Sequence, residues 1–240
     1  MRTILILLGP IFMAHSAIAQ SILSRADSIG DTAKVCYNNG QFYEAISLYT
    51  EAIELLDNSY SNDSVYSHLR LLTAYYYDRG LCFRAIDRHE AAILDLYKCE
   101  TYHKQEVDIH KRGSPRLKAY KWHRISTYAI ASSLFELGQY QKAILELDTF
   151  LSVHTVDGES YSLRGQAKLK LDDFQGAIKD FDSAIANGAD DKGFLTYLKA
   201  LAKLKSNAFD VDEACSDFWE AYNDYGYMEA KSMFSTVCID

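Results

Sequence analysis

The sequence predicts an all-α fold built from repeated helical hairpins. Apolar and small residues recur at helical spacing along most of the chain, whereas the alternating Val, Ile and Thr runs that strands require do not occur. One pattern of small and aromatic residues also recurs: "NGQFYEAISLYTEAIEL" begins at Asn39, "LGQYQKAILELDTFL" at Leu137 and "LDDFQGAIKDFDSAI" at Leu171. Such recurrence is typical of hairpins that stack on one another.

Residues 1–19 are expected to be a signal peptide. A basic start precedes an apolar run over 4–14, and "AIA" at 17–19 matches the small-x-small pattern that signal peptidase cleaves. We predict cleavage between Ala19 and Gln20, and hence an exported protein that is periplasmic or secreted. The apolar run is short for a membrane span, which needs about 20 residues, and no later segment approaches that length. A buried first helix is the alternative interpretation.

The charge distribution argues against nucleic-acid binding. The formal net charge is -8, whereas a protein that binds nucleic acid in general needs a basic footprint. The segment from Glu100 to Arg124 is an exception, because it holds seven Lys and Arg against three Asp and Glu. We expect a basic surface here, either a docking site or a solvated helical face, at Arg116, Lys118, Lys121 and Arg124.

The repeat can be measured from an alanine early in the second helix of each hairpin. The anchors are Ala45, Ala85, Ala143, Ala177 and Ala214. They are 40, 58, 34 and 37 residues apart, which we interpret as a unit of 34 with insertions of 6, 24, 0 and 3. The predicted units are 26–59, 66–99, 124–157, 158–191 and 195–228, with a helical insertion over 100–123 and a terminal helix at about 227–238.

A 34-residue period of paired helices resembles the tetratricopeptide repeat family. The small residue that the family places in the middle of its first helix is here Ala33, Thr73, Ala131, Gly165 and Ala202. The turn glycine is Gly40, Gly80 and Gly138, with Asp172 in the fourth unit and Phe209 in the fifth. The large packing residue of the second helix is Tyr49, His89, Leu147, Phe181 and Phe218. The resemblance implies a right-handed superhelical solenoid of about five helix-turn-helix units.

The insertion before the third unit is expected to lengthen helices. Ser114 suits an N-cap, and Pro115 suits the first position of a helix. One long helix is therefore predicted from Pro115 to about Leu137, with Gly138 ending it.

The five cysteines allow one disulfide. Cys215 and Cys238 lie near the outer ends of two successive predicted helices, with Gly226 near the midpoint between them. An antiparallel hairpin brings such positions together, so a disulfide is possible, and two buried thiols are the alternative. The ending of the chain also looks like the terminal helices of exported bacterial tetratricopeptide repeat proteins. The remaining cysteines, expected to be free, are Cys36, Cys82 and Cys99.

No catalytic or metal-binding motif stands out. His103, His110 and His123 cluster near the insertion, but their spacing is not a zinc signature, and we expect a solvated helical surface there. Gly-rich phosphate loops, G-x-S-x-G and H-E-x-x-H are missing from the sequence. His89 falls on the packing stripe and is expected in the core. We therefore expect no enzymatic activity, no metal and no cofactor.

The resemblance implies that a concave groove, lined by the first helices, binds a protein or peptide. The family's groove positions correspond to Lys34, Tyr37, Asn38, Arg70, Tyr77, Asp78, Tyr128, Ser132, Glu136, Gln166, Lys170, Lys199 and Lys203. The expected function is a monomeric, non-catalytic scaffold in the cell envelope. A structural subunit of an envelope assembly and a module that binds a glycan or cell-wall polymer are the alternatives.

Overall fold

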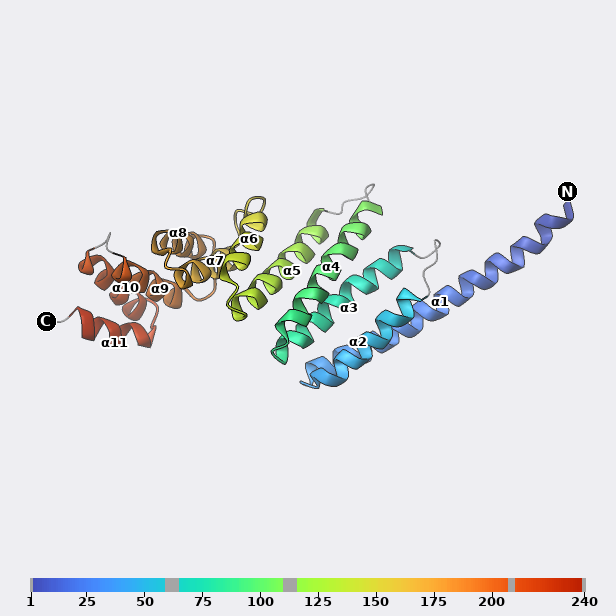
Figure 1. Ribbon diagram of the computed structural model, residues 1–240, viewed down its shortest axis with the longest axis horizontal. Helices are drawn as coiled ribbons and strands as arrows, with labels where there is room; N and C mark the ends of the chain where they lie inside the picture. The colour runs from blue at the N-terminus through green and yellow to red at the C-terminus, as the bar shows by residue number, and fades with distance from the viewer. Residues whose placement is uncertain (1, 59–64, 110–115, 207–209, 239–240) are drawn as a thin grey trace. The chain divides into compact units, whose positions relative to one another are not determined.

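The chain folds into helices joined by short turns. The computed structural model describes residues 2–58, 65–109, 116–206 and 210–238 (Figure 1). Side chains are described for residues 17–58, 65–109, 123–206 and 210–238. These residues contain no strand, which confirms the all-α prediction. The helices are α1 (Arg2–Asn38), α2 (Phe42–Asp57), α3 (Val65–Ala85), α4 (His89–Ile109), α5 (Arg116–Glu136), α6 (Tyr140–Leu151), α7 (Gly158–Lys170), α8 (Phe174–Ala186), α9 (Lys192–Lys205), α10 (Val211–Asn223) and α11 (Met228–Val237).

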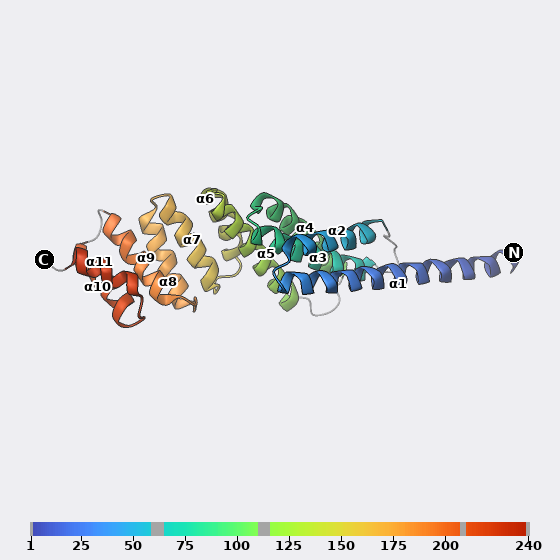
Figure 2. The ribbon, with the colours of Figure 1, turned by 90° about the horizontal axis from the view of Figure 1, so that it is seen from below.

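The helices pack in chain order within two compact bodies, residues 1–133 and 134–240. In the first body α2 lies against α1 and α3, and α4 lies against α3. In the second body each helix from α6 to α11 contacts the next. The first helices of successive pairs are also in contact: α1 contacts α3, and α7 contacts α9 (Figure 2). Each body is therefore a stack of helix-turn-helix units, as the repeat predicts.

The turns between paired helices share one backbone geometry. Four of them place a residue of positive φ at the same position: Gly40 (76°), Asp87 (57°), Gly138 (70°) and Asp172 (59°). The amide of the following residue donates to a carbonyl five residues earlier, as in Gln41 N to Cys36 O (2.9 Å) and Asp173 N to Lys168 O (3.0 Å). The left-handed residue, together with this hydrogen bond across five residues, ends the helix and reverses the chain. The fifth turn, with Phe209, lies outside the described residues.

The second unit is shifted by seven residues from its predicted register. Its turn is at Asp87 and α4 begins at His89, so the alanine in the fourth position of the second helix is Ala92. The predicted anchor, Ala85, is instead the exposed last residue of α3. Gly80, predicted in the turn, lies buried inside α3 as the small residue of the first helix. Seven residues make almost two helical turns, so a repeat register that is wrong by seven residues still places the apolar residues on the same side of each helix. Helical periodicity alone therefore did not reveal the shift.

The corrected register gives one set of packing positions in all five second helices. Its large residues, Tyr49, Leu96, Leu147, Phe181 and Phe218, are fully buried. The position three residues later is buried as well and holds Ala52, Cys99, Phe150, Ala184 and Ala221. His89 is therefore not a core residue. It begins α4 and is only half-buried, with its Nε2 3.8 Å from Asp87 Oδ1.

All described residues of the predicted insertion, 100–109 and 116–123, are helical. α4 continues to Ile109 and α5 begins at Arg116, whereas Ser114 and Pro115 lie outside the described residues. At the other end of the chain, α1 is continuous through Ala19 and Gln20. Cleavage between them stays a prediction. Of the helices in the described part of the chain, none has the length and apolar character needed to cross a membrane.

A disulfide joins the last two helices. Cys215 of α10 and Cys238, the C-cap of α11, are bonded, with their Cα atoms 5.8 Å apart. The structure therefore contains the disulfide and not the alternative of two buried thiols. The cysteines of the first body, Cys36, Cys82 and Cys99, are free and buried.

Candidate functional site

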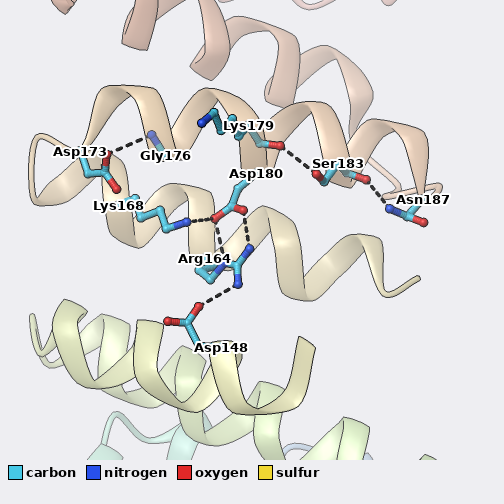
Figure 3. A network of polar contacts seen from close by, with 9 residues as sticks. All are labelled: Asp148, Arg164, Lys168, Asp173, Gly176, Lys179, Asp180, Ser183 and Asn187. Carbon is cyan, nitrogen blue, oxygen red and sulfur yellow. Dashed lines mark hydrogen bonds and ion pairs between the residues drawn. The ribbon is translucent and has the colours of Figure 1, made fainter. Parts of the chain in front are cut away.

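An arginine of the first helix connects neighbouring helices in the same way in two of the repeat units. Arg164 of α7 donates from Nε and Nη2 to both oxygens of Asp180 on α8, at 2.9 and 2.6 Å. Its Nη1 donates to Asp148 of the preceding α6 at 2.7 Å, and Lys168 lies 2.8 Å from Asp180 (Figure 3). The arginine thus ties a first helix both to its own second helix and to the second helix of the unit before.

Arg79 repeats this arrangement in the first body. Its Nε and Nη2 donate to Asp95 of α4 at 2.7 and 2.9 Å, and its Nη1 donates to Thr50 of α2 at 2.9 Å. Burial lowers the pKa of Arg79, but the hydrogen bonds and charge of Asp95 more than offset burial, so the pKa is raised overall. The same balance raises the pKa of Arg164 beside Asp180. Both guanidinium groups therefore stay charged, and the paired geometry makes these contacts strong and directional.

In the last unit, lysines in place of an arginine connect the first helix to two second helices. Lys199 and Lys203 of α9 lie 3.4 and 2.8 Å from the carboxylate of Asp217 on α10. Lys199 also lies 3.3 Å from Asp182 of α8. Burial lowers the pKa of Lys199, and the charges of Asp217 and Asp182 raise it by more. Lys199 and Lys203, which the family resemblance assigned to the binding groove, thus form ion pairs within the protein.

The first helices of the first body bring several predicted site residues together. Lys34 of α1 forms an ion pair with Asp78 of α3, with Nζ 2.9 Å from Oδ1. The hydroxyl of Tyr49 donates to the other oxygen of Asp78 at 3.3 Å. The ammonium of Lys34 also lies 5.2 Å from the centre of the Tyr37 ring. Residues predicted in two different units therefore form one connected cluster.

A tyrosine and an arginine extend this cluster toward α5. Arg84, in the last turn of α3, donates from Nη2 to Ser132 Oγ of α5 at 2.9 Å. Tyr77 is half-buried, and its pKa is raised by burial and by the charge of Asp78, while the charge of Arg84 acts in the opposite direction. We call this set of side chains on three first helices the α1/α3/α5 face, made up of Lys34, Tyr37, Tyr77, Asp78, Arg84 and Ser132.

Sequence reasoning missed Arg84. In the corrected register Arg84 occupies the position that Tyr37 holds in the first unit, eight residues before the anchor alanine. With Ala92 as the anchor, Arg84 falls on a groove position of the second unit. The signal for this choice is the large packing residue four positions after the anchor, which becomes the buried Leu96 in place of His89.

The other predicted groove residues are scattered. Asn38, Arg70, Glu136 and Lys170 are exposed, and Tyr128 is half-buried. Gln166 donates within its own helix to Ser162 Oγ at 3.2 Å. Of the basic surface, only Arg124 has a described side chain, which is half-buried. The side chains of Arg116, Lys118 and Lys121 lie outside the described residues.

The part of the chain that the structure describes offers no set of three His, Cys, Asp or Glu side chains that could hold a metal ion. The expectation of a solvated surface is wrong for His103, which is buried with its Nδ1 3.4 Å from Glu106 Oε2. His123 is half-buried, and His110 lies outside the described residues. The side chains of the α1/α3/α5 face provide hydrogen-bond donors, hydrogen-bond acceptors and two aromatic rings. Their chemistry suits recognition of a polar chain.

Two family models, both described as tetratricopeptide repeat, match the sequence at residues 128–192 and 30–57. None of the curated proteins matches it significantly. A structure of MamA from Desulfovibrio magneticus RS-1 superposes with a TM-score of 0.63 at 14% identity, covering 87% of this chain and 96% of that one. A structure of YrrB, described as a tetratricopeptide repeat protein with an unusual peptide-binding site, gives a TM-score of 0.56 at 14% identity, over 85% of this chain and 90% of that one. These matches confirm the repeat fold.

Proposed function

Because this chain is a tetratricopeptide repeat protein, we propose that it is a scaffold that binds an extended segment of a partner protein on the α1/α3/α5 face. Proteins of this family are typically non-catalytic scaffolds. The single observation that carries the proposal is the convergence of Lys34, Tyr37, Asp78, Arg84 and Ser132 from three successive first helices.

The physical character of this face supports peptide recognition. Its tyrosines offer apolar area together with a polar tip, which is a combination enriched at interfaces. Lys34 and Asp78 are already oriented by their mutual contact, so little side-chain entropy is lost when a ligand binds. The backbone of these helices is hydrogen-bonded internally, so specificity must come from side chains.

A photo-crosslinking amino acid at an exposed position next to this face tests the proposal. We choose Asn38, which is exposed and lies one helical turn beyond Lys34. The matched control is Leu94 on α4, a second helix, where the side chain is 68% exposed. Irradiation in cells should give the same covalent protein adduct in replicate experiments from position 38 and not from position 94. Adducts of equal yield from both positions, or none from position 38, would contradict it.

The proposal places the protein outside the cytoplasm after removal of residues 1–19. It is supported by the basic start, the apolar run and the small residues around Ala19 in the sequence. Expression of the full chain in a Gram-negative bacterium, followed by intact mass measurement of the purified protein, tests it. A chain that begins at Gln20 is expected, and Ala19→Arg should block the cleavage. An uncleaved wild-type chain in the cytoplasm would contradict the proposal.

A further inference from the structure

Within the proposed peptide-binding function, on which this inference rests, we infer that Arg84 anchors a carboxylate of an Asp or Glu side chain in the bound peptide. The site consists of Arg84 itself, Ser132, which orients it, and the neighbouring Tyr77. The acidic peptide would cross the α1/α3/α5 face, with one acidic side chain directed at the guanidinium group.

Among the described residues, Arg84 has no carboxylate partner, in contrast to four other half-buried cations of the first helices. Arg79, Arg164, Lys199 and Lys203 each contact a carboxylate on a second helix. Within the described part of the chain, Arg84 contacts no carboxylate, and its hydrogen bond goes to the neutral hydroxyl of Ser132. Its Nε is shielded from water and has no hydrogen-bond partner. A half-buried positive charge that lacks compensation favours an anion at its remaining terminal nitrogen.

The acid on the same face does not compete for this position. Asp78 is already satisfied by Lys34 Nζ at 2.9 Å and by the hydroxyl of Tyr49 at 3.3 Å. Its charge is therefore largely neutralised within the protein. An incoming carboxylate would meet Arg84 Nη1, which has no partner among the described residues, beside an aspartate whose charge is already paired.

The position of Arg84 favours an acidic side chain within a peptide over a terminal carboxylate. Arg84 belongs to α3, which contacts α1 on one side, and its hydrogen bond reaches α5 on the other. Polar and aromatic side chains continue on both sides, with Tyr37 on α1 and Ser132 on α5. A peptide that lies across these three helices passes over Arg84 and continues beyond it. Its acidic residue is therefore internal.

Selection from a phage library of random dodecapeptides tests this inference. The library is displayed at the N-terminus of the coat protein, so no peptide carries a free C-terminal carboxylate. The baits are the wild-type protein, Arg84→Gln, and Arg88→Gln as the control. Arg88 is exposed and lies 5.4 Å from the centre of the Phe83 ring, outside the α1/α3/α5 face. Thermal melts of all three proteins verify that each is folded.

The wild-type protein and Arg88→Gln should both enrich peptides with a conserved internal Asp or Glu. A synthetic, C-terminally amidated copy of the selected peptide should bind Arg84→Gln about tenfold more weakly or worse, as expected for loss of a charged hydrogen bond. Selected peptides without an acidic preference, or equal affinity for Arg84→Gln, would overturn the inference and leave peptide binding intact. If no peptide is selected at all, the proposed function fails, and this inference fails with it.

Discussion

Arg164 and Asp180 face each other across adjacent helices with two nearly parallel hydrogen bonds of 2.9 and 2.6 Å. Asp180 is 2% exposed, and it also takes the ion pair from Lys168. The same geometry in Arg79 and Asp95 shows that the repeat carries a recurring polar contact within its apolar stack. These contacts set how a first helix sits against two second helices, and therefore how each body presents its first helices.

Asp180→Ala should strongly destabilise the second body. The substitution leaves the charges of Arg164 and Lys168 without their buried partner, and breaking a buried pair in this way costs about 3–5 kcal/mol. Asp148→Ala is the matched control, because that carboxylate contacts the same arginine while its side chain is 52% exposed. We expect it to cost about 1 kcal/mol or less. Urea unfolding followed by circular dichroism measures both, and equal losses would show that burial does not govern the pair.

Asp172→Gly should stabilise the protein slightly. Asp172 has a φ of 59°, where a side chain is strained and glycine is not, although glycine also gives the unfolded chain more freedom. The net gain should be below about 1 kcal/mol. Gly138→Ala at the equivalent turn, with a φ of 70° and no atom close to the new Cβ, should lose about 1 kcal/mol. Opposite shifts in the midpoint of urea unfolding are expected, and shifts of the same sign would contradict this explanation of the turns.

The cysteines should react in two separate stages. Cys36, Cys82 and Cys99 are buried, so a thiol reagent such as DTNB should modify them only after unfolding. Cys215 and Cys238 should add their two thiols only after reduction. Reduction should also destabilise the last two helices by about 3 kcal/mol, since the bond closes a loop with a sequence separation of 23. A denatured, unreduced sample that yields five thiols would show that the disulfide does not form.

Stability should fall in alkaline solution. Burial, with a smaller effect from the charge of Asp78, raises the pKa of the Cys82 thiol to about 12, while the charge of Lys34 acts in the opposite direction. The unfolded thiol has a pKa of about 8.5, so between these values the unfolded state has lost a proton that the folded state keeps. The stabilisation is therefore complete below about pH 8.5 and is lost as the pH rises toward 12.

Two buried tyrosines should add to this alkaline loss. Burial is the main cause that raises the pKa of Tyr49 and of Tyr75 far above the usual value. The free energy of unfolding, measured in urea at pH 8 and pH 10.5, should be smaller at the higher pH. Cys82→Ala should reduce the difference between the two values. A pH-independent free energy would show that these groups titrate alike in both states.

The sequence by itself determined the class of fold and predicted about five helix pairs, but it left the Cys215–Cys238 disulfide open beside the alternative of two buried thiols. Small and large residues at helical spacing encode the stripe on each second helix, and burial of Ala45, Tyr49, Ala177 and Phe181 follows from that stripe. A helix reversal also needs a special residue, so Gly40 and Gly138 could be recognised locally. These features depend on neighbours within one hairpin, which is why a single chain of letters reveals them.

Only the tertiary structure decided the register of the second unit and the fate of the charged residues. A shift of seven residues leaves the apolar face almost unchanged, so the turn at Asp87, and with it the site position of Arg84, required the folded backbone. Which lysines are free and which are paired depends on carboxylates such as Asp217, contributed by another helix. Electrostatic contacts join residues that are distant in sequence, and their partners are set by how the helices pack and not by any local pattern.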